Sequence, residues 1–156
     1  MEKLPKYYFA YGSNMNPERM KERGVNYRWY KKAVLKDYRL VFNKERLNGS
    51  AAANIEPFPG AVVEGVLYEL ENPRRGIDNL DVYEGYPDHY DRMVVKVETE
   101  DGEVYDAIVY IAQPWRVFKP LREYFNHLLE ACKLGILSEG YCKRLKALYN
   151  YYFESE

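Results

Sequence analysis

The chain of 156 residues is long enough for one domain with its own hydrophobic core, and we expect residues 1–156 to form a single domain. Hydrophobic residues make up 47% of it and charged residues 30%, a balance that is typical of globular proteins and argues against disorder. A net charge of -1 disfavours a general nucleic-acid binder, and no apolar run reaches the roughly 18 residues that a membrane helix needs.

The counts of cysteine and histidine limit the chemistry of the protein. Two cysteines, Cys132 and Cys142, and two histidines are too few for a disulfide framework or a multi-ligand metal site. The first residues also lack the apolar segment of a secretory signal. We therefore expect a cytoplasmic protein without a metal site and without a membrane partner.

Charge is unevenly distributed along the chain. Basic residues exceed acidic ones by seven over residues 1–55, whereas acidic residues exceed basic ones by ten over residues 56–106. Two interpretations remain open. The two segments can pair across the fold, or the basic segment can form one wall of a site for an anionic small molecule.

The predicted fold opens with an aromatic strand over residues 6–11. A loop over residues 12–14 ends this strand. Asn16 and Pro17 then supply the N-cap and the first-turn proline of a short helix, which we expect to end at Gly24.

The next segment alternates between extended chain and turns. Residues 33–42 have the composition of extended chain, with a possible turn at residues 36–37. A short strand is expected over residues 51–55, a turn over residues 57–60, and a further strand over residues 61–70.

Helices and a hairpin are predicted after residue 71. Asn72 and Pro73 open a helix that ends near Gly85, and an Asp101-Gly102 turn joins two strands over residues 92–112. The C-terminal third has the spacing of two helices. With about six short strands, these elements predict an α+β fold, a small mixed β-barrel with flanking helices.

The loop Gly12-Ser13-Asn14 is a candidate anion site. It lies between a strand and a helix N-terminus, where backbone N–H groups lack partners and glycine permits close approach of a ligand. Such a loop can hold a carboxylate or a developing oxyanion, although it can also be a plain strand-to-helix turn. It matches neither a nucleotide phosphate loop nor a serine-hydrolase elbow.

Glu84 is the candidate acid and base. It lies four residues after Leu80 and seven after Ile77, so helical spacing places it on their apolar face. Burial and the helix C-terminus both raise the pKa of a carboxyl group there. A raised pKa suits a group that accepts and then donates a proton near neutral pH. A frayed glutamate in solvent is the alternative interpretation.

Other polar residues offer weaker alternatives. Asp81 is the second candidate acid, four residues past Ile77 on the same helix, within an otherwise solvated acidic surface. A nucleophilic Ser13 would need His89 or His127 as its base, and no local motif connects either histidine to it.

Five segments follow one another along the chain: Tyr8-Phe9-Ala10-Tyr11-Gly12-Ser13-Asn14-Met15, Asp37-Tyr38-Arg39-Leu40, Ala53-Asn54-Ile55, Glu64-Gly65-Val66-Leu67-Tyr68 and Leu80-Asp81-Val82-Tyr83-Glu84-Gly85. Together they resemble the γ-glutamylcyclotransferase family of glutathione metabolism. The similarity extends over roughly residues 7–148. The loop and the downstream Leu-Asp-x-x-Glu-Gly are specific for the family when they occur together, whereas either motif alone is weak evidence for it.

The resemblance implies a small mixed barrel with a substrate pocket at one mouth and no metal or organic cofactor. It also implies a reaction, in which the α-amine of a γ-glutamyl group attacks its own side-chain amide and releases 5-oxoproline. Glu84 matches the catalytic glutamate of the family. The implied substrate contacts are Tyr8, Phe9, Ala10, Tyr11, Gly12, Ser13, Asn14, Tyr90 and Tyr124. The spacing between Glu84 and Tyr90 differs from the family pattern by one residue.

Three other functions remain open at this stage. The chain can be a cyclotransferase for a γ-glutamylamine or a γ-glutamyl-protected biosynthetic intermediate. It can also be a non-catalytic module that binds a small molecule in the same pocket. A binder of single-stranded nucleic acid that stacks bases on tyrosines is disfavoured by the acidic middle segment. A homodimer formed through Tyr151, Tyr152 and Phe153 is possible.

Overall fold

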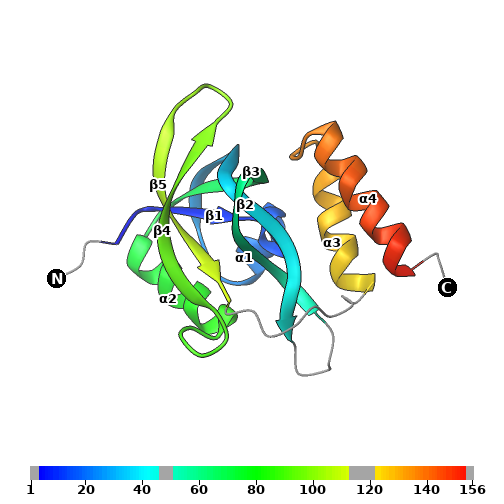
Figure 1. Cartoon of the computed structure of the whole chain (residues 1–156). Helices are drawn as coiled ribbons and strands as arrows, with labels where there is room; N and C mark the ends of the chain where they lie inside the picture. Colours follow the sequence, from blue (N-terminus) through cyan, green and yellow to red (C-terminus); the bar gives the residue numbers. More distant parts are fainter. Residues whose placement is uncertain (1–3, 46–50, 113–121, 154–156) are drawn as a thin grey trace.

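The computed structural model describes residues 4–45, 51–112 and 122–153, and a closed five-stranded barrel lies at its centre (Figure 1). Its elements are β1 Tyr7–Ala10, the 3-10 turn η1 Ser13–Met15, α1 Pro17–Glu22, β2 Tyr27–Glu45, β3 Ala51–Leu70, α2 Pro73–Glu84, β4 Asp91–Thr99, β5 Val104–Ile111, α3 Arg122–Lys133 and α4 Glu139–Phe153. The strand order is β1-β3-β2-β4-β5. β5 closes the barrel by pairing with β1 in parallel, whereas the other pairs are antiparallel. The predicted mixed barrel with flanking helices is thus confirmed.

The two longest strands correct the prediction of about six short ones. β2 and β3 are each continuous and pair along most of their length, so residues 57–60 do not end a strand. Instead the register shifts between Lys36 and Tyr38, where the extra residues of β3 form a bulge. Asp37 and Gly60 face each other there with positive φ angles, and the Gly60 N–H donates to Asp37 Oδ1 at 3.0 Å. The turn-forming residues therefore curve a long ladder that closes a barrel.

The first two helices begin and end where the sequence predicts. The Asn16 side chain accepts from the backbone N–H of Glu18, and Asn72 caps α2 in the same way. α2 ends at Gly85, whose φ of 68° is the left-handed conformation that favours glycine. These caps fix Glu84 as the last residue of α2.

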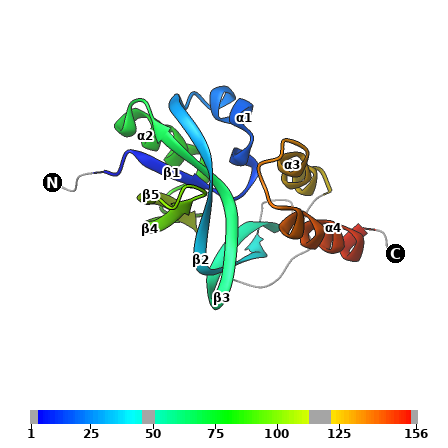
Figure 2. The ribbon, with the colours of Figure 1, turned by 90° about the horizontal axis from the view of Figure 1, so that it is seen from above.

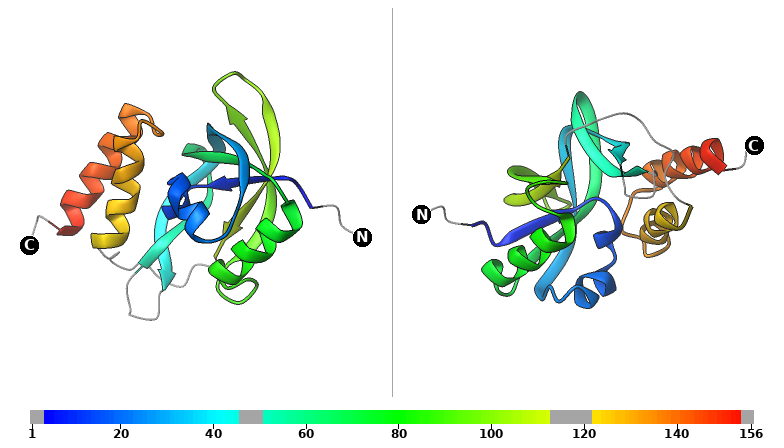
Figure 3. Two further views of the ribbon diagram at one scale, coloured as in Figure 1. Left: turned by 180° about the vertical axis from the view of Figure 1, so that it is seen from behind. Right: turned by 90° about the horizontal axis from the view of Figure 1, so that it is seen from below.

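The last two helices form an antiparallel pair beside the barrel. α1 lies between this pair and α2 (Figures 2 and 3). Phe125 of α3 stacks on Phe42 of β2 at 5.4 Å between ring centroids, which ties the pair to the barrel. A disulfide joins Cys132 to Cys142 and links α3 to α4, a bond that the sequence analysis did not anticipate.

Ion pairs show how the uneven charge is accommodated. Lysines of β2 pair with acids on β4 and on its turn to β5; Lys36, for example, lies 3.0 Å from Glu98. Arg39 of β2 also pairs with Glu56 of β3. The basic first segment and the acidic middle segment therefore meet across the barrel surface, as the first of the two interpretations expected.

Within residues 4–45, 51–112 and 122–153, no helix combines the length and the apolar character that crossing a membrane requires.

Candidate active site

Glu84 lies at the end of α2 on the face that packs against the barrel. Leu80 and Ile77, one and two turns earlier, are fully buried, as their spacing predicts. Glu84 itself is half-buried. Burial raises the pKa of its carboxyl to about 7, and the nearby Arg23 partly opposes this rise. The helix C-terminus also disfavours the charged form. The expected direction of the pKa shift is therefore confirmed.

Tyrosines gather around this carboxyl. Burial raises the pKa of the Tyr11 hydroxyl, and the charges of Tyr90, Glu84 and Tyr124 raise it further, so these groups lie close together. The pKa of Tyr8 is raised by burial and by Glu84. The cluster brings together residues from β1, α2, α3 and the segment before β4. Five of the predicted site residues thus converge in space.

The Gly12 loop forms one wall of this cluster. It is followed by the 3-10 turn η1, in which the N–H of Met15 donates to the Gly12 carbonyl at 3.0 Å. The N–H groups of Ser13 and Asn14 precede the first hydrogen bond of the turn. A Cβ atom at Gly12 would lie only 2.9 Å from the Tyr124 hydroxyl. Glycine therefore allows Tyr124 to rest directly on the loop.

One of the predicted contact residues, Phe9, lies differently from the rest. Phe9 is fully buried, and its ring packs against Gly65. Because successive side chains of a strand point to opposite faces, Phe9 faces away from the side on which Tyr8 and Ala10 lie. Its contribution to a substrate site is then limited to its backbone.

Tyr90 is fixed by a hydrogen bond to β3. Its hydroxyl donates to the carbonyl of Ala53 at 2.7 Å. The adjacent Asn54 is buried and exchanges two hydrogen bonds with the backbone of Ala112, at 2.7 and 2.8 Å. The Ala53-Asn54-Ile55 motif therefore anchors Tyr90 and joins β3 to the end of β5.

Asp81, the second candidate acid, has strong hydrogen-bond partners. Its carboxylate forms an ion pair with Arg92 and accepts from the Tyr110 hydroxyl at 2.7 Å. Tyr110 in turn accepts, through its carbonyl, a hydrogen bond of 2.6 Å from the Tyr11 hydroxyl. The sequence placed Asp81 in a solvated acidic surface, and this prediction is wrong. Asp81 joins α2 to β4 and β5.

Arg23 is the residue at the site that sequence reasoning missed. Its guanidinium donates to Asn14 Oδ1 and lies over the Tyr83 ring, 3.7 Å from the centroid. The only sequence signal was its place at the end of α1, one residue before the helix-ending Gly24.

Two further points concern His127 and metal binding. His127 lies on α3 and faces Arg19 and Arg23 of α1; burial first, and then these two cations, lower its pKa. In the described part of the chain, no three or more His, Cys, Asp or Glu side chains group as a metal site.

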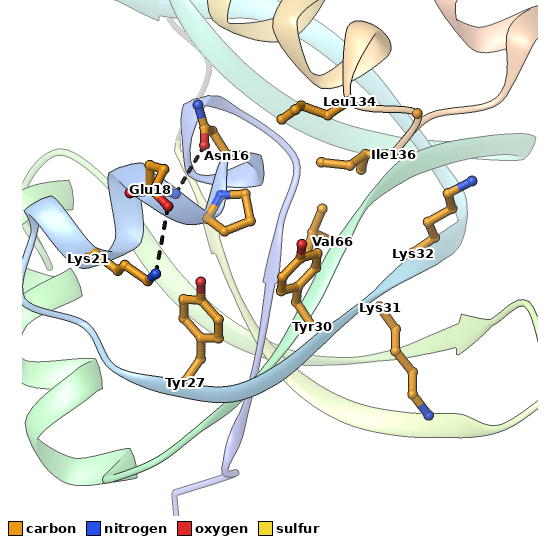
Figure 4. Close-up of a pocket in the computed structure, with 12 residues that line it drawn as sticks. Asn16, Glu18, Lys21, Tyr27, Tyr30, Lys31, Lys32, Val66, Leu134 and Ile136 are labelled. Atoms are coloured by element: carbon orange, nitrogen blue, oxygen red, sulfur yellow. Dashed lines mark hydrogen bonds and ion pairs between the residues drawn. The ribbon is translucent and has the colours of Figure 1, made fainter.

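A separate pocket of about 530 Å³ opens between α1, β2 and the turn after α3. The Tyr27 and Tyr30 side chains point toward it, with Leu134 and Ile136 on the opposite side (Figure 4). Glu84 is not among the residues that line it.

The fold and the site together define a class of protein: a small mixed barrel with one carboxyl of raised pKa among tyrosines and beside a glycine turn. Residues 8–127 match the family described as gamma-glutamyl cyclotransferase, AIG2-like, and the chain belongs to this family.

Individual relatives agree with this assignment. The chain is 29% identical over 147 residues to the gamma-glutamylcyclotransferase of Homo sapiens, covering 90% of this chain and 77% of that protein. It is 32% identical over 149 residues to the putative gamma-glutamylcyclotransferase YkqA of Bacillus subtilis, covering 92% of this chain and 52% of that protein. A solved gamma-glutamyl cyclotransferase structure superposes with a TM-score of 0.80 at 28% identity, over 90% of this chain and 86% of that one.

Proposed function

We propose that this chain is a γ-glutamylcyclotransferase that releases 5-oxoproline and a free amino acid or amine. The observation that carries the proposal is Glu84, a half-buried carboxyl with a pKa of about 7, set among tyrosines and beside the Gly12 loop. Membership of the family supports the same reaction.

The proposed reaction uses Glu84 twice. Its carboxylate first takes a proton from the α-ammonium of the γ-glutamyl group, and the free amine then attacks the side-chain amide carbon. A C–N bond forms and the carbonyl becomes a tetrahedral oxyanion. The protonated Glu84 then gives its proton to the leaving nitrogen, the original amide bond breaks, and the carboxylate is restored. The ring nitrogen, which still carries one proton too many, loses it to the released amine. A pKa near 7 suits both steps at neutral pH.

The remaining cluster residues are proposed to bind the substrate. The N–H groups of Ser13 and Asn14 precede the first hydrogen bond of η1 and can receive the α-carboxylate or the oxyanion. Tyr8, Tyr90 and Tyr124 are proposed to surround the substrate bound at Glu84. Holding both ends of the γ-glutamyl group places the amine next to the carbonyl, and such orientation is worth several kcal/mol of the barrier.

The test is release of 5-oxoproline from a panel of γ-glutamyl dipeptides, γ-glutamylamines and glutathione. We expect native protein to release it from at least one member and Glu84→Gln to release none. Asp78→Asn is the matched control, because it makes the same carboxylate-to-amide change at an exposed position of the same helix. Full activity of a folded Glu84→Gln would contradict the proposed role.

The same panel separates the alternative functions. Turnover restricted to amines would indicate a γ-glutamylamine substrate. Binding of 5-oxoproline without any turnover would indicate a non-catalytic module.

We also propose a cytoplasmic location. The formation of a homodimer stays a prediction. Trapping of free thiols in a cell extract tests the location, since a reducing compartment would open the Cys132–Cys142 disulfide that the structure contains and leave two thiols. Of the residues considered for a dimer, Tyr151 is exposed and Phe153 packs on Tyr149 at 4.9 Å between ring centroids. Light scattering of Tyr151→Ser beside the native protein tests the dimer.

A further inference from the structure

Arg23 occupies a fixed position between α1 and the end of α2. It is the C-terminal cap of α1, and its N–H donates to the Arg19 carbonyl at 3.1 Å. The next residue, Gly24, has a φ of 74°, and its carbonyl accepts from Asn79 Nδ2 at 2.9 Å. Because Asn79 and Glu84 lie on the same helix, this hydrogen bond fixes the end of α1 relative to Glu84.

The guanidinium of Arg23 reaches from this position to the buried Asn14. Arginine has only donors, so the Asn14 side-chain oxygen must face it. The amide nitrogen of Asn14 then faces the other way and donates to the Tyr8 hydroxyl oxygen at 3.1 Å. The Asn14 backbone is held too, because its carbonyl accepts from Tyr68 at 2.7 Å. The hydrogen bonds therefore run in one direction, from Arg23 through Asn14 to Tyr8.

This direction determines where the Tyr8 proton points. The Tyr8 oxygen already accepts from Asn14, so its single O–H is left to donate. Tyr8 is buried and close enough to Glu84 for the glutamate charge to raise its pKa. The proton is thus available to the Glu84 carboxylate or to a substrate oxygen beside it.

We propose that Arg23 is a positioning residue for this reaction, which directs the Tyr8 hydroxyl toward the reacting groups through Asn14. This inference rests on the proposed function. Arg23 touches no reacting atom in this scheme; it acts through Asn14 and through its charge. It stays in place because its guanidinium also lies over the Tyr83 ring, next to Glu84.

The charge of Arg23 adds a second effect. The groups that act on one another around Glu84 are Tyr8, Tyr11 and Tyr110, all proton donors of raised pKa, together with the cation of Arg23. Arg23 is the group that lowers the pKa of Glu84. Without it, Glu84 would hold its proton to higher pH, and less of the general base would be available at neutrality.

The test compares Arg23→Met and Arg23→Lys with Lys21→Met, which removes an exposed cation from the same helix. We expect Arg23→Met to lower kcat/KM about tenfold or more and to move the acid limb of its pH profile to higher pH. Arg23→Lys keeps a cation, so its acid limb should stay in place while kcat/KM falls, since lysine cannot reproduce the planar donor. Lys21→Met should match the native protein.

Two further sets of variants show which groups transmit the effect of Arg23 on kcat/KM and on the pH profile. If Arg23 acts through Tyr8, the loss of kcat/KM that Arg23→Met causes on the plateau above the acid limb should largely disappear in a Tyr8→Phe background, whereas the shift of the limb itself should remain. The same profiles in a His127→Gln background separate Glu84 from His127, which Arg23 also faces.

The outcomes distinguish this inference from the function on which it rests. An active native protein with Arg23→Met indistinguishable from Lys21→Met would overturn the role of Arg23 and leave the cyclotransferase standing. Additive losses from Arg23→Met and Tyr8→Phe would overturn the route through Asn14. No product from the native protein on the whole panel would overturn the proposed function, and the role of Arg23 with it.

Discussion

Two carboxylates on α2, three residues apart, have different surroundings. Asp81 is held by Arg92 and by the Tyr110 hydroxyl, and it joins the helix to β4 and β5. Glu84 lies at the tyrosine cluster, and in the described part of the chain no group donates a hydrogen bond to its carboxylate. Partners therefore make one acid a structural anchor, whereas burial without partners leaves the other able to exchange a proton near neutrality.

The largest expected effect concerns this difference in role. Glu84→Gln should lower kcat by about 10²- to 10⁴-fold, the usual contribution of a general acid–base group, while its far-UV spectrum stays native. Asp81→Asn should retain measurable turnover. Steady-state kinetics of both variants on one substrate checks this, and the comparison fails if Asp81→Asn is the more damaging of the two.

Stability should respond in the opposite order. Asp81→Asn leaves Arg92 without its partner, and we expect the free energy of unfolding to fall by about 2 kcal/mol. Urea denaturation at pH 7 measures this loss. Asp78→Asn, which breaks only an exposed ion pair with Arg74, should change the value by about 0.5 kcal/mol or less. Equal losses in both variants would show that Asp81 is no anchor.

The pH dependence of stability sharpens the contrast. The pKa of Glu84 in the folded protein, about 7, exceeds the unfolded value of 4.5, so folding favours the protonated form. Ionised Glu84 therefore reduces stability as the pH rises from 4.5 to 7. Glu84→Gln should match the native protein below pH 4.5 and exceed its free energy of unfolding above pH 7, by on the order of 2 kcal/mol. A constant difference across this range would contradict the assigned burial.

The smallest expected effect concerns Tyr90. Tyr90→Phe removes its hydrogen bond to the Ala53 carbonyl and should cost about 1 kcal/mol of stability. If Tyr90 also contacts the substrate, KM should rise while the pH profile stays unchanged. Urea denaturation and a KM measurement on the same preparation separate the two contributions.

Local signals allowed Glu84 to be predicted from the sequence. The Asn72 cap, the glycine after Glu84, and the spacing from Ile77 and Leu80 all lie within one helix. The partners of Asp81 come from β4 and β5, at separations of 11 and 29 residues, and no local pattern predicts such contacts. Residues 57–60 likewise have the composition of a turn, and only their pairing with β2 shows that the strand continues through a bulge.

The role of Arg23 could not be predicted from the sequence for a different reason. It is close in sequence to Asn14, yet its side chain reaches the site only because α1 folds back over the loop and is fixed to α2 by Asn79. The charge distribution assigns Arg23 to the basic segment over residues 1–55 but does not distinguish it from the other basic residues there. Its role follows from the direction of hydrogen bonds, which requires the side-chain geometry.

The proposed mechanism depends most on the titration of Glu84. Its carboxyl carbon can be followed by NMR in glutamate-labelled protein, with the resonance assigned by its loss in Glu84→Gln. We expect a midpoint near pH 7, as burial in the tyrosine cluster requires. A midpoint near 4.5 would show a solvated carboxylate, and it would contradict the proposal that Glu84 both accepts and donates the proton in the reaction.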